Sequence, residues 1–144
     1  MTEPDSANTD AGFRLSLTHY EAGRFTEAEA AFRAILERSP DHGQALYFLA
    51  ILTYQTNRPV EAVRLAERAV IHLPDAADCH NLHGVVLLAL KRPAEAEAAL
   101  RQALDRDPAF AGAANNLGAA LESQGRAADA ADAFRQALSI DPAY

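Results

Sequence analysis

Small and apolar residues recur along this 144-residue chain at the spacing of an amphipathic helix, and the pattern appears four times. In the last copy Ala114, Leu117, Gly118 and Leu121 stand at positions i, i+3, i+4 and i+7, which places them on one helical face. A second apolar stripe, spaced by four residues, follows in every copy. The pattern therefore predicts two helices per copy, joined by a turn.

Four prolines repeat every 34 residues and fix the length of each copy: Pro40, Pro74, Pro108 and Pro142. Proline cannot continue a helix, so each is expected to end the second helix of its copy. Between the two helices, Gly23, Asn57 and Gly125 can adopt the left-handed conformation that stops a helix. Pro59 and Pro93 suit a first helical turn, where no amide donor is needed.

A unit of this length cannot bury its apolar face alone and must stack on its neighbours. The period divides the chain into repeats 9–42, 43–76, 77–110 and 111–144. Residues 1–8 are polar and are expected to form a flexible tail outside this repeat domain, which covers residues 9–144.

The repeated unit resembles the tetratricopeptide repeat family. The family pattern of Leu-Gly, a large apolar residue three positions later, Ala-x3-Phe and a final Pro is matched in the fourth copy by Leu117, Gly118, Leu121, Ala130, Phe134 and Pro142. The departures are local: the chain has no tryptophan, Ser16 and Ala50 replace the glycine, and His83 replaces the leucine. The resemblance implies an all-α, right-handed superhelical α-solenoid of four helix–turn–helix repeats.

In this family the first helix of each repeat lines a concave groove that binds a peptide. The resemblance therefore implies a predicted groove formed by Phe13, Leu17, Tyr20, Tyr47, Ile51, Tyr54, Asn81, Val85, Leu88, Asn115, Ala119 and Glu122. From the first repeat to the last, the side chains of this predicted groove change from aromatic to polar. Family members that hold the C-terminal carboxylate of chaperone tails use lysine, arginine and asparagine on these helices. The only lysine here, Lys91, falls in a turn, so that clamp is not expected.

Charge and composition narrow the class of partner. The chain carries a net charge of −7, with a pI near 5.1 and no basic cluster, which argues against nucleic acid or an anionic membrane surface. No apolar run approaches the ~20 residues that span a bilayer. The acidic, polar start differs from a secretory signal, and one cysteine cannot form an intramolecular disulfide, so a cytoplasmic protein is expected.

The sequence offers little catalytic chemistry. It has no glycine-rich phosphate loop and no nucleophile in a recognisable setting, so neither an enzyme nor a cofactor is expected. Cys79 and His83 stand at i and i+4 beside His80, a spacing that can place metal ligands on one helical face. However, His80 and His83 occupy the positions of Leu46 and Leu49 one repeat earlier, so they are expected to pack between helices without a metal.

The sequence thus favours a non-catalytic interaction scaffold that binds a peptide or protein segment through apolar and aromatic contacts. Two alternatives stay open: a substrate-selecting array of a larger enzyme, such as a glycosyltransferase or sulfotransferase, and a self-assembly module. The last helix presents Phe134, Leu138 and Ile140, and an uncovered apolar strip there predicts a homo-oligomer through the C-terminal repeat. The repeated arginine and acid positions near each turn are expected to be solvated or paired.

Overall fold

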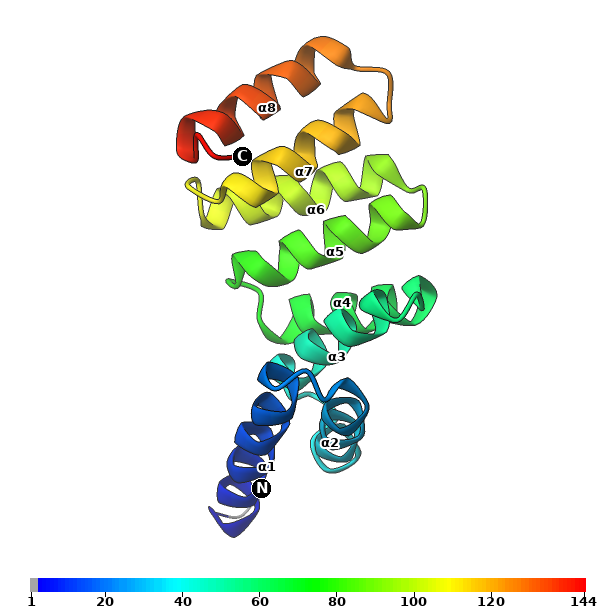
Figure 1. Ribbon diagram of the computed structural model, residues 1–144, viewed down its shortest axis with the longest axis vertical. Helices are drawn as coiled ribbons and strands as arrows, with labels where there is room; N and C mark the ends of the chain where they lie inside the picture. Colours follow the sequence, from blue (N-terminus) through cyan, green and yellow to red (C-terminus); the bar gives the residue numbers. More distant parts are fainter. Residues whose placement is uncertain (1–2) are drawn as a thin grey trace. The chain divides into compact units, whose positions relative to one another are not determined.

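The computed structural model describes residues 3–144 and contains only α-helices over that range (Figure 1). The helices are α1 (Glu3–Glu21), α2 (Phe25–Arg38), α3 (Gly43–Gln55), α4 (Pro59–His72), α5 (Ala77–Ala89), α6 (Pro93–Arg106), α7 (Ala111–Glu122) and α8 (Ala127–Ile140). The prediction of an all-α chain of helix–turn–helix repeats is confirmed. Residues 3–8, expected as a flexible tail, begin α1 as helix; Met1 and Thr2 lie outside the described residues.

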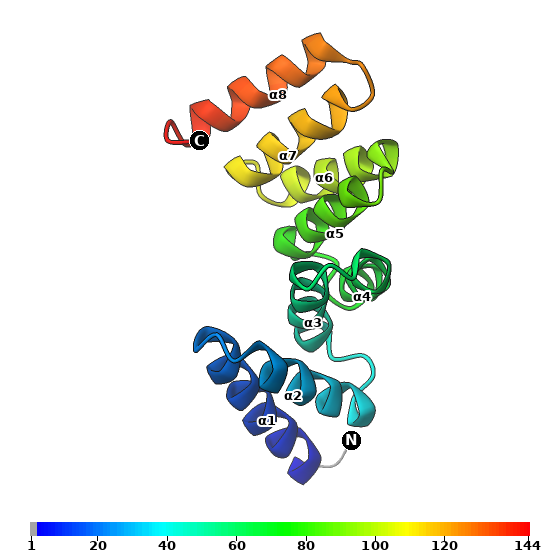
Figure 2. The ribbon, with the colours of Figure 1, turned by 45° about the vertical axis from the view of Figure 1, so that its right-hand side comes forward.

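The chain forms two compact units: the N-terminal unit, Met1–His72, holds α1 to α4, and the C-terminal unit, Leu73–Tyr144, holds α5 to α8. In the N-terminal unit each helix packs against the next one in sequence. The same holds in the C-terminal unit, where α5 also contacts α7, the first helix of the following repeat (Figure 2). First helices of successive repeats therefore adjoin there.

The turns between paired helices share one geometry. Gly23, Asn57 and Gly125 have φ values of 72°, 59° and 75°, which confirms their predicted left-handed conformation. The residue after each of these donates its backbone N–H to the carbonyl oxygen five positions earlier. For example, Arg58 N–H donates to the Thr53 carbonyl at 2.8 Å. Lys91 fills the same position in the third repeat with φ 59°, which the sequence had not predicted.

Glycine allows the two helices of a repeat to approach closely. A Cβ at Gly118 would lie 2.5 Å from the ring of Phe134, so α7 and α8 pack at this position only because the side chain is absent. In the second repeat the corresponding residues, Ala50 and Ala66, are both fully buried. The predicted column of small residues therefore sets the helix spacing within each repeat.

Candidate functional site

An aromatic cluster joins α1, α2 and α3 in the N-terminal unit. Phe48 on α3 stacks on Phe32 of α2, with ring centroids 5.6 Å apart and planes 6° from parallel. Tyr20 and Tyr47 each approach the Phe48 ring edge-on, both at 5.3 Å. Phe13 lies 5.9 Å from Phe32 and 6.1 Å from Phe48. The structure thus brings together three of the predicted groove residues, Phe13, Tyr20 and Tyr47.

Burial within this cluster is uneven. Phe32 is 0% exposed, whereas Phe13, Tyr20, Tyr47 and Phe48 are half-buried. A half-buried ring held by a buried ring keeps one apolar side accessible in a fixed orientation, and such rings can bind a ligand with little further loss of side-chain entropy. The cluster therefore joins one fully buried ring in the core to four rings that keep some exposed surface.

Three further predicted groove residues of the N-terminal unit, Leu17 on α1 and Ile51 and Tyr54 on α3, are also half-buried. Phe48, which has the most ring contacts in the cluster, was missed. Its column holds Leu82 and Asn116 in later repeats, so the repeat alignment gave no aromatic signal at this position.

The predicted groove of the C-terminal unit is built from different side chains. The Asn116 amide nitrogen on α7 donates to the Asn81 amide oxygen on α5 at 3.0 Å, which ties the two first helices together. Asn115, Val85 and Leu88 are half-buried and Glu122 is exposed. Every residue of the predicted groove therefore keeps some exposed surface, although its chemistry changes from aromatic to amide and aliphatic.

Charged residues fasten consecutive second helices in the N-terminal unit. Glu29 on α2 accepts hydrogen bonds from Arg58, at 2.6 Å, and from Arg33, which also donates to Glu61 at 2.7 Å. The bonds from Arg58, reinforced by Arg33, lower the pKa of Glu29 from 4.5 to about 2, against the opposing effect of burial. This carboxylate joins α2 to the start of α4.

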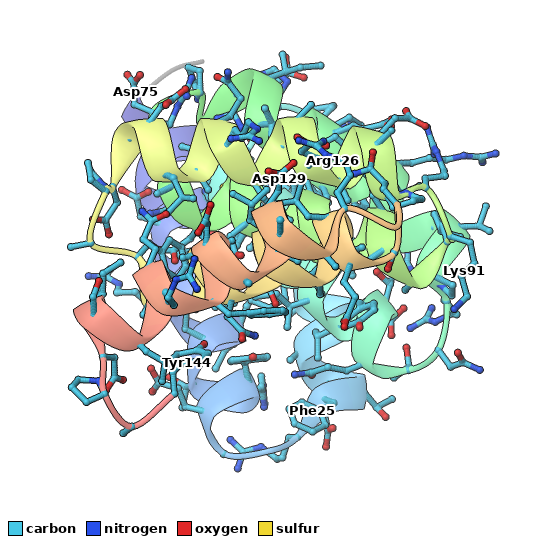
Figure 3. All side chains as sticks on the ribbon, turned by 90° about the horizontal axis from the view of Figure 1, so that it is seen from above. Phe25, Asp75, Lys91, Arg126, Asp129 and Tyr144 are labelled. Atoms are coloured by element: carbon cyan, nitrogen blue, oxygen red, sulfur yellow. The ribbon has the colours of Figure 1, made fainter. Side chains whose placement is uncertain are left out.

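The same arrangement recurs in the C-terminal unit. Glu97 on α6 accepts from Gln124 at 2.9 Å, and from Arg101 and Arg126, and these bonds lower its pKa to about 2. Arg126 also pairs with Asp129 at 2.8 Å, and both lie near the start of α8 (Figure 3). The expectation that the repeated arginines and acids are paired holds at these positions, and no ligand is needed to explain them.

Two of the three candidate metal ligands on α5, Cys79 and His80, are buried in the protein interior. Cys79 and His80 are 2% and 5% exposed, and His80 Nε2 lies 2.8 Å from the Pro74 carbonyl oxygen. Burial, together with the neighbouring Asp78, raises the pKa of the Cys79 thiol to about 11. Among the side chains of residues 8–144, which the structure describes, no group of three or more histidine, cysteine, aspartate or glutamate residues could hold a metal ion.

The predicted self-association edge is partly covered. Phe134 is half-buried against Gly118 within its own repeat, and Ile140 is half-buried. Leu138 is 47% exposed. Of the three residues, Leu138 therefore offers the most accessible apolar surface. None of the described helices is both long and apolar enough to cross a membrane.

Solved structures with the same fold are known. A structure of MamA is 21% identical to this chain and matches 97% of it and 81% of its own chain, with a TM-score of 0.87. MamA from Desulfovibrio magneticus RS-1 is 18% identical, with coverages of 94% and 76% and a TM-score of 0.84. YrrB is 21% identical, with coverages of 96% and 71% and a TM-score of 0.84. No curated protein matches the sequence.

Because the sequence identities of these structures are low, the similarities show the fold of this chain and nothing about its function. The family is shown by the sequence itself. The profile of the tetratricopeptide repeat matches residues 13–80 and 81–144, so it spans nearly the whole chain. The chain belongs to the tetratricopeptide repeat family.

Proposed function

We propose that this protein is a non-catalytic scaffold that binds an extended peptide or protein segment along the first helices of its repeats. Tetratricopeptide repeat proteins are typically interaction modules without catalytic activity. The observation that carries the proposal is the open aromatic cluster of the N-terminal unit, in which half-buried Tyr20, Tyr47 and Phe48 contact one another or the fully buried Phe32.

Aromatic side chains supply a large share of the energy at protein interfaces, because they bury much apolar area with few rotatable bonds. Here the neighbouring Phe48 ring restricts the orientation of Tyr47, so an incoming apolar side chain meets a prepared surface. YrrB, which has the same fold, is described as having an unusual peptide-binding site. That description concerns YrrB, and it supports the class of ligand proposed here without locating it.

The proposal is tested with a displayed library of random 12-residue peptides, selected on the wild-type chain. Replacing Tyr47 and Tyr54 together by alanine should weaken the selected peptides at least about tenfold, because two accessible aromatic contacts are lost. Circular dichroism should show an unchanged helical signal. The matched control is Tyr144→Ala, which removes an equally large and 56% exposed ring outside the predicted groove.

Equal affinities for the wild type and the double variant would contradict the proposal, as would equal losses in the double variant and in Tyr144→Ala. A library that yields no binder on the wild type would also count against peptide recognition. The possibility of a substrate-selecting array within a larger enzyme predicts the same groove contacts, and it differs in requiring a catalytic domain in the same polypeptide.

A second candidate function, self-association through the C-terminal repeat, has one specific observation in its favour. Leu138 on α8 is a large apolar residue whose surface is 47% exposed. Covering such a side chain with a second copy would remove apolar area from water. This function does not compete with peptide binding, because it uses the second helix of the last repeat.

A further inference from the structure

Lys91 is unusual for its position in the backbone. It lies in the left-handed region at φ 59°, where the other repeats have Gly23, Asn57 and Gly125. Glycine and asparagine tolerate this conformation, whereas a long side chain is strained there. Lys91 is also the only lysine of the chain. A residue that opposes the local preference points to a role for its side chain.

Lys91 lines a hollow of about 490 Å³ in the C-terminal unit. Its other lining residues are Leu88, Pro93, Ala119 and Ser123. Leu88 and Ala119 belong to the predicted groove, so the hollow opens beside it, at the ends of α5 and α7. In Figure 3, Lys91 stands at the turn between α5 and α6. The hollow is thus lined by one cationic residue, by Ser123, whose hydroxyl donates to the Ala119 carbonyl at 2.8 Å, and by three apolar residues.

Electrostatics distinguishes Lys91 from the arginines of the same unit. Arg92 pairs with Glu95, and Arg126 pairs with Glu97 and Asp129. Within the part of the chain that the structure describes, no carboxylate lies within ion-pair distance of Lys91. In a protein with a net charge of −7, an unneutralised ammonium group beside a hollow favours a carboxylate from outside.

We propose that this hollow holds an aspartate or glutamate side chain of the bound segment, with the carboxylate against Lys91 and the adjoining apolar atoms on Leu88, Pro93 and Ala119. This inference rests on the proposed peptide-binding function and adds a specificity to it. The volume of the hollow exceeds what a carboxylate alone fills, so it suits a side chain together with the backbone that carries it.

The test compares peptides selected from the random library on the wild type, on Lys91→Asn and on Arg135→Gln. Asparagine fits the left-handed position, as Asn57 shows, so Lys91→Asn should fold and melt a few degrees higher than the wild type. Arg135→Gln is the matched control: it removes one positive charge from an exposed arginine of α8, which pairs with Asp132 three positions earlier on the same helix. Wild type and control should select one acidic residue at a fixed distance from an apolar one, and Lys91→Asn should not.

A double-mutant cycle then measures the contact itself. Changing the selected acid of the peptide to its amide should weaken binding to the wild type about threefold, the range of an exposed ion pair, and should leave binding to Lys91→Asn unchanged. Because Lys91 is the sole lysine, reductive ¹³C-methylation labels only its Nζ and the chain's N-terminal amine. The NMR chemical shift of the ¹³C-methyl groups on Lys91 should change when the acidic peptide is added and should stay unchanged with the amide peptide.

Three results would overturn the inference. The peptides selected on the wild type could lack a shared acidic residue, or changing that acid to its amide could weaken binding to Lys91→Asn as much as to the wild type. The third is that the affinity difference between the acidic peptide and its amide disappears when the peptide's C-terminus is amidated. The last would assign the charge to the chain end and not to a side chain. Failure of the proposed function looks different, since the selected peptides would then bind the Tyr47 and Tyr54 double variant as tightly as the wild type.

Discussion

The close approach of α7 and α8 predicts that adding one methyl group at Gly118 destabilises the fold. In an exposed helix, replacing glycine by alanine is favourable by about 0.5–1 kcal/mol, because alanine loses less backbone entropy. At Gly118, however, the new Cβ would lie 2.5, 2.6 and 2.8 Å from three atoms of the Phe134 ring. A rigid ring cannot yield by rotating a terminal methyl group, and overpacking of this kind costs about 1–3 kcal/mol.

The net effect expected for Gly118→Ala is therefore a loss of about 1 kcal/mol in the free energy of unfolding. Gly12→Ala is the matched control, because Gly12 also lies inside a helix, but the nearest described atom to its added Cβ would be in the Ile35 side chain, at an ordinary contact distance of 3.8 Å. That variant should gain about 0.5–1 kcal/mol. Urea unfolding followed by circular dichroism should place the two midpoints on opposite sides of the wild type.

A double variant tests whether the Phe134 ring is the cause. Gly118→Ala combined with Phe134→Ala copies the alanine pair found at Ala50 and Ala66, so the added methyl group should be neutral or stabilising in that background. The reasoning is refuted if Gly118→Ala raises the unfolding midpoint as Gly12→Ala does, or if its cost persists without the ring.

Two further predictions concern charge and association. The pKa values of Glu29 and Glu97 are about 2 in the folded state against 4.5 ordinarily, so their stabilisation is complete above about pH 5 and lost as the pH falls toward 2. The side chains of their arginine partners are 37–52% exposed, so solvent screening limits the contribution to about 1 kcal/mol each. Glu29→Gln should reduce the acid sensitivity of the urea midpoint, and an unchanged pH profile would contradict the assigned role. Light scattering at ~100 μM should show wild-type self-association that Leu138→Glu abolishes, whereas a monomeric wild type at that concentration would exclude this interface.

Sequence reasoning predicted the features that follow from local chemistry repeated in register. The prolines set the ends of the second helices, and Asn57 took its left-handed turn, because one residue type determines the backbone at each of these positions. Phe48 and Lys91 escaped prediction for the opposite reason. The environment of Phe48 depends on rings from α1 and α2, and the conformation of Lys91 is imposed by its turn against its own preference. The contacts of Phe48 and the backbone conformation of Lys91 therefore depend on the folded structure around them and not on the residue type alone.

The ion-pair clusters show a longer period that the 34-residue alignment concealed. Glu29 and Glu97 stand 68 residues apart, whereas Val63 and Ala131 hold the same position in the second and fourth repeats. Neither of these side chains can accept a hydrogen bond from arginine, so the clusters occur once in each compact unit. A pair of repeats, and not the single repeat, is therefore the element that the charged residues stabilise.

The same two-repeat division separates the two surfaces that we propose for peptide recognition. The N-terminal unit presents linked aromatic rings, while the C-terminal unit presents the Asn81–Asn116 amide pair and the hollow beside Lys91. Apolar contacts contribute binding energy with little regard to sequence, whereas an amide pair and a single ammonium group discriminate by hydrogen bonding and charge. Substitutions in the N-terminal unit should then lower affinity for all ligands in common, and substitutions in the C-terminal unit should change which ligands are preferred.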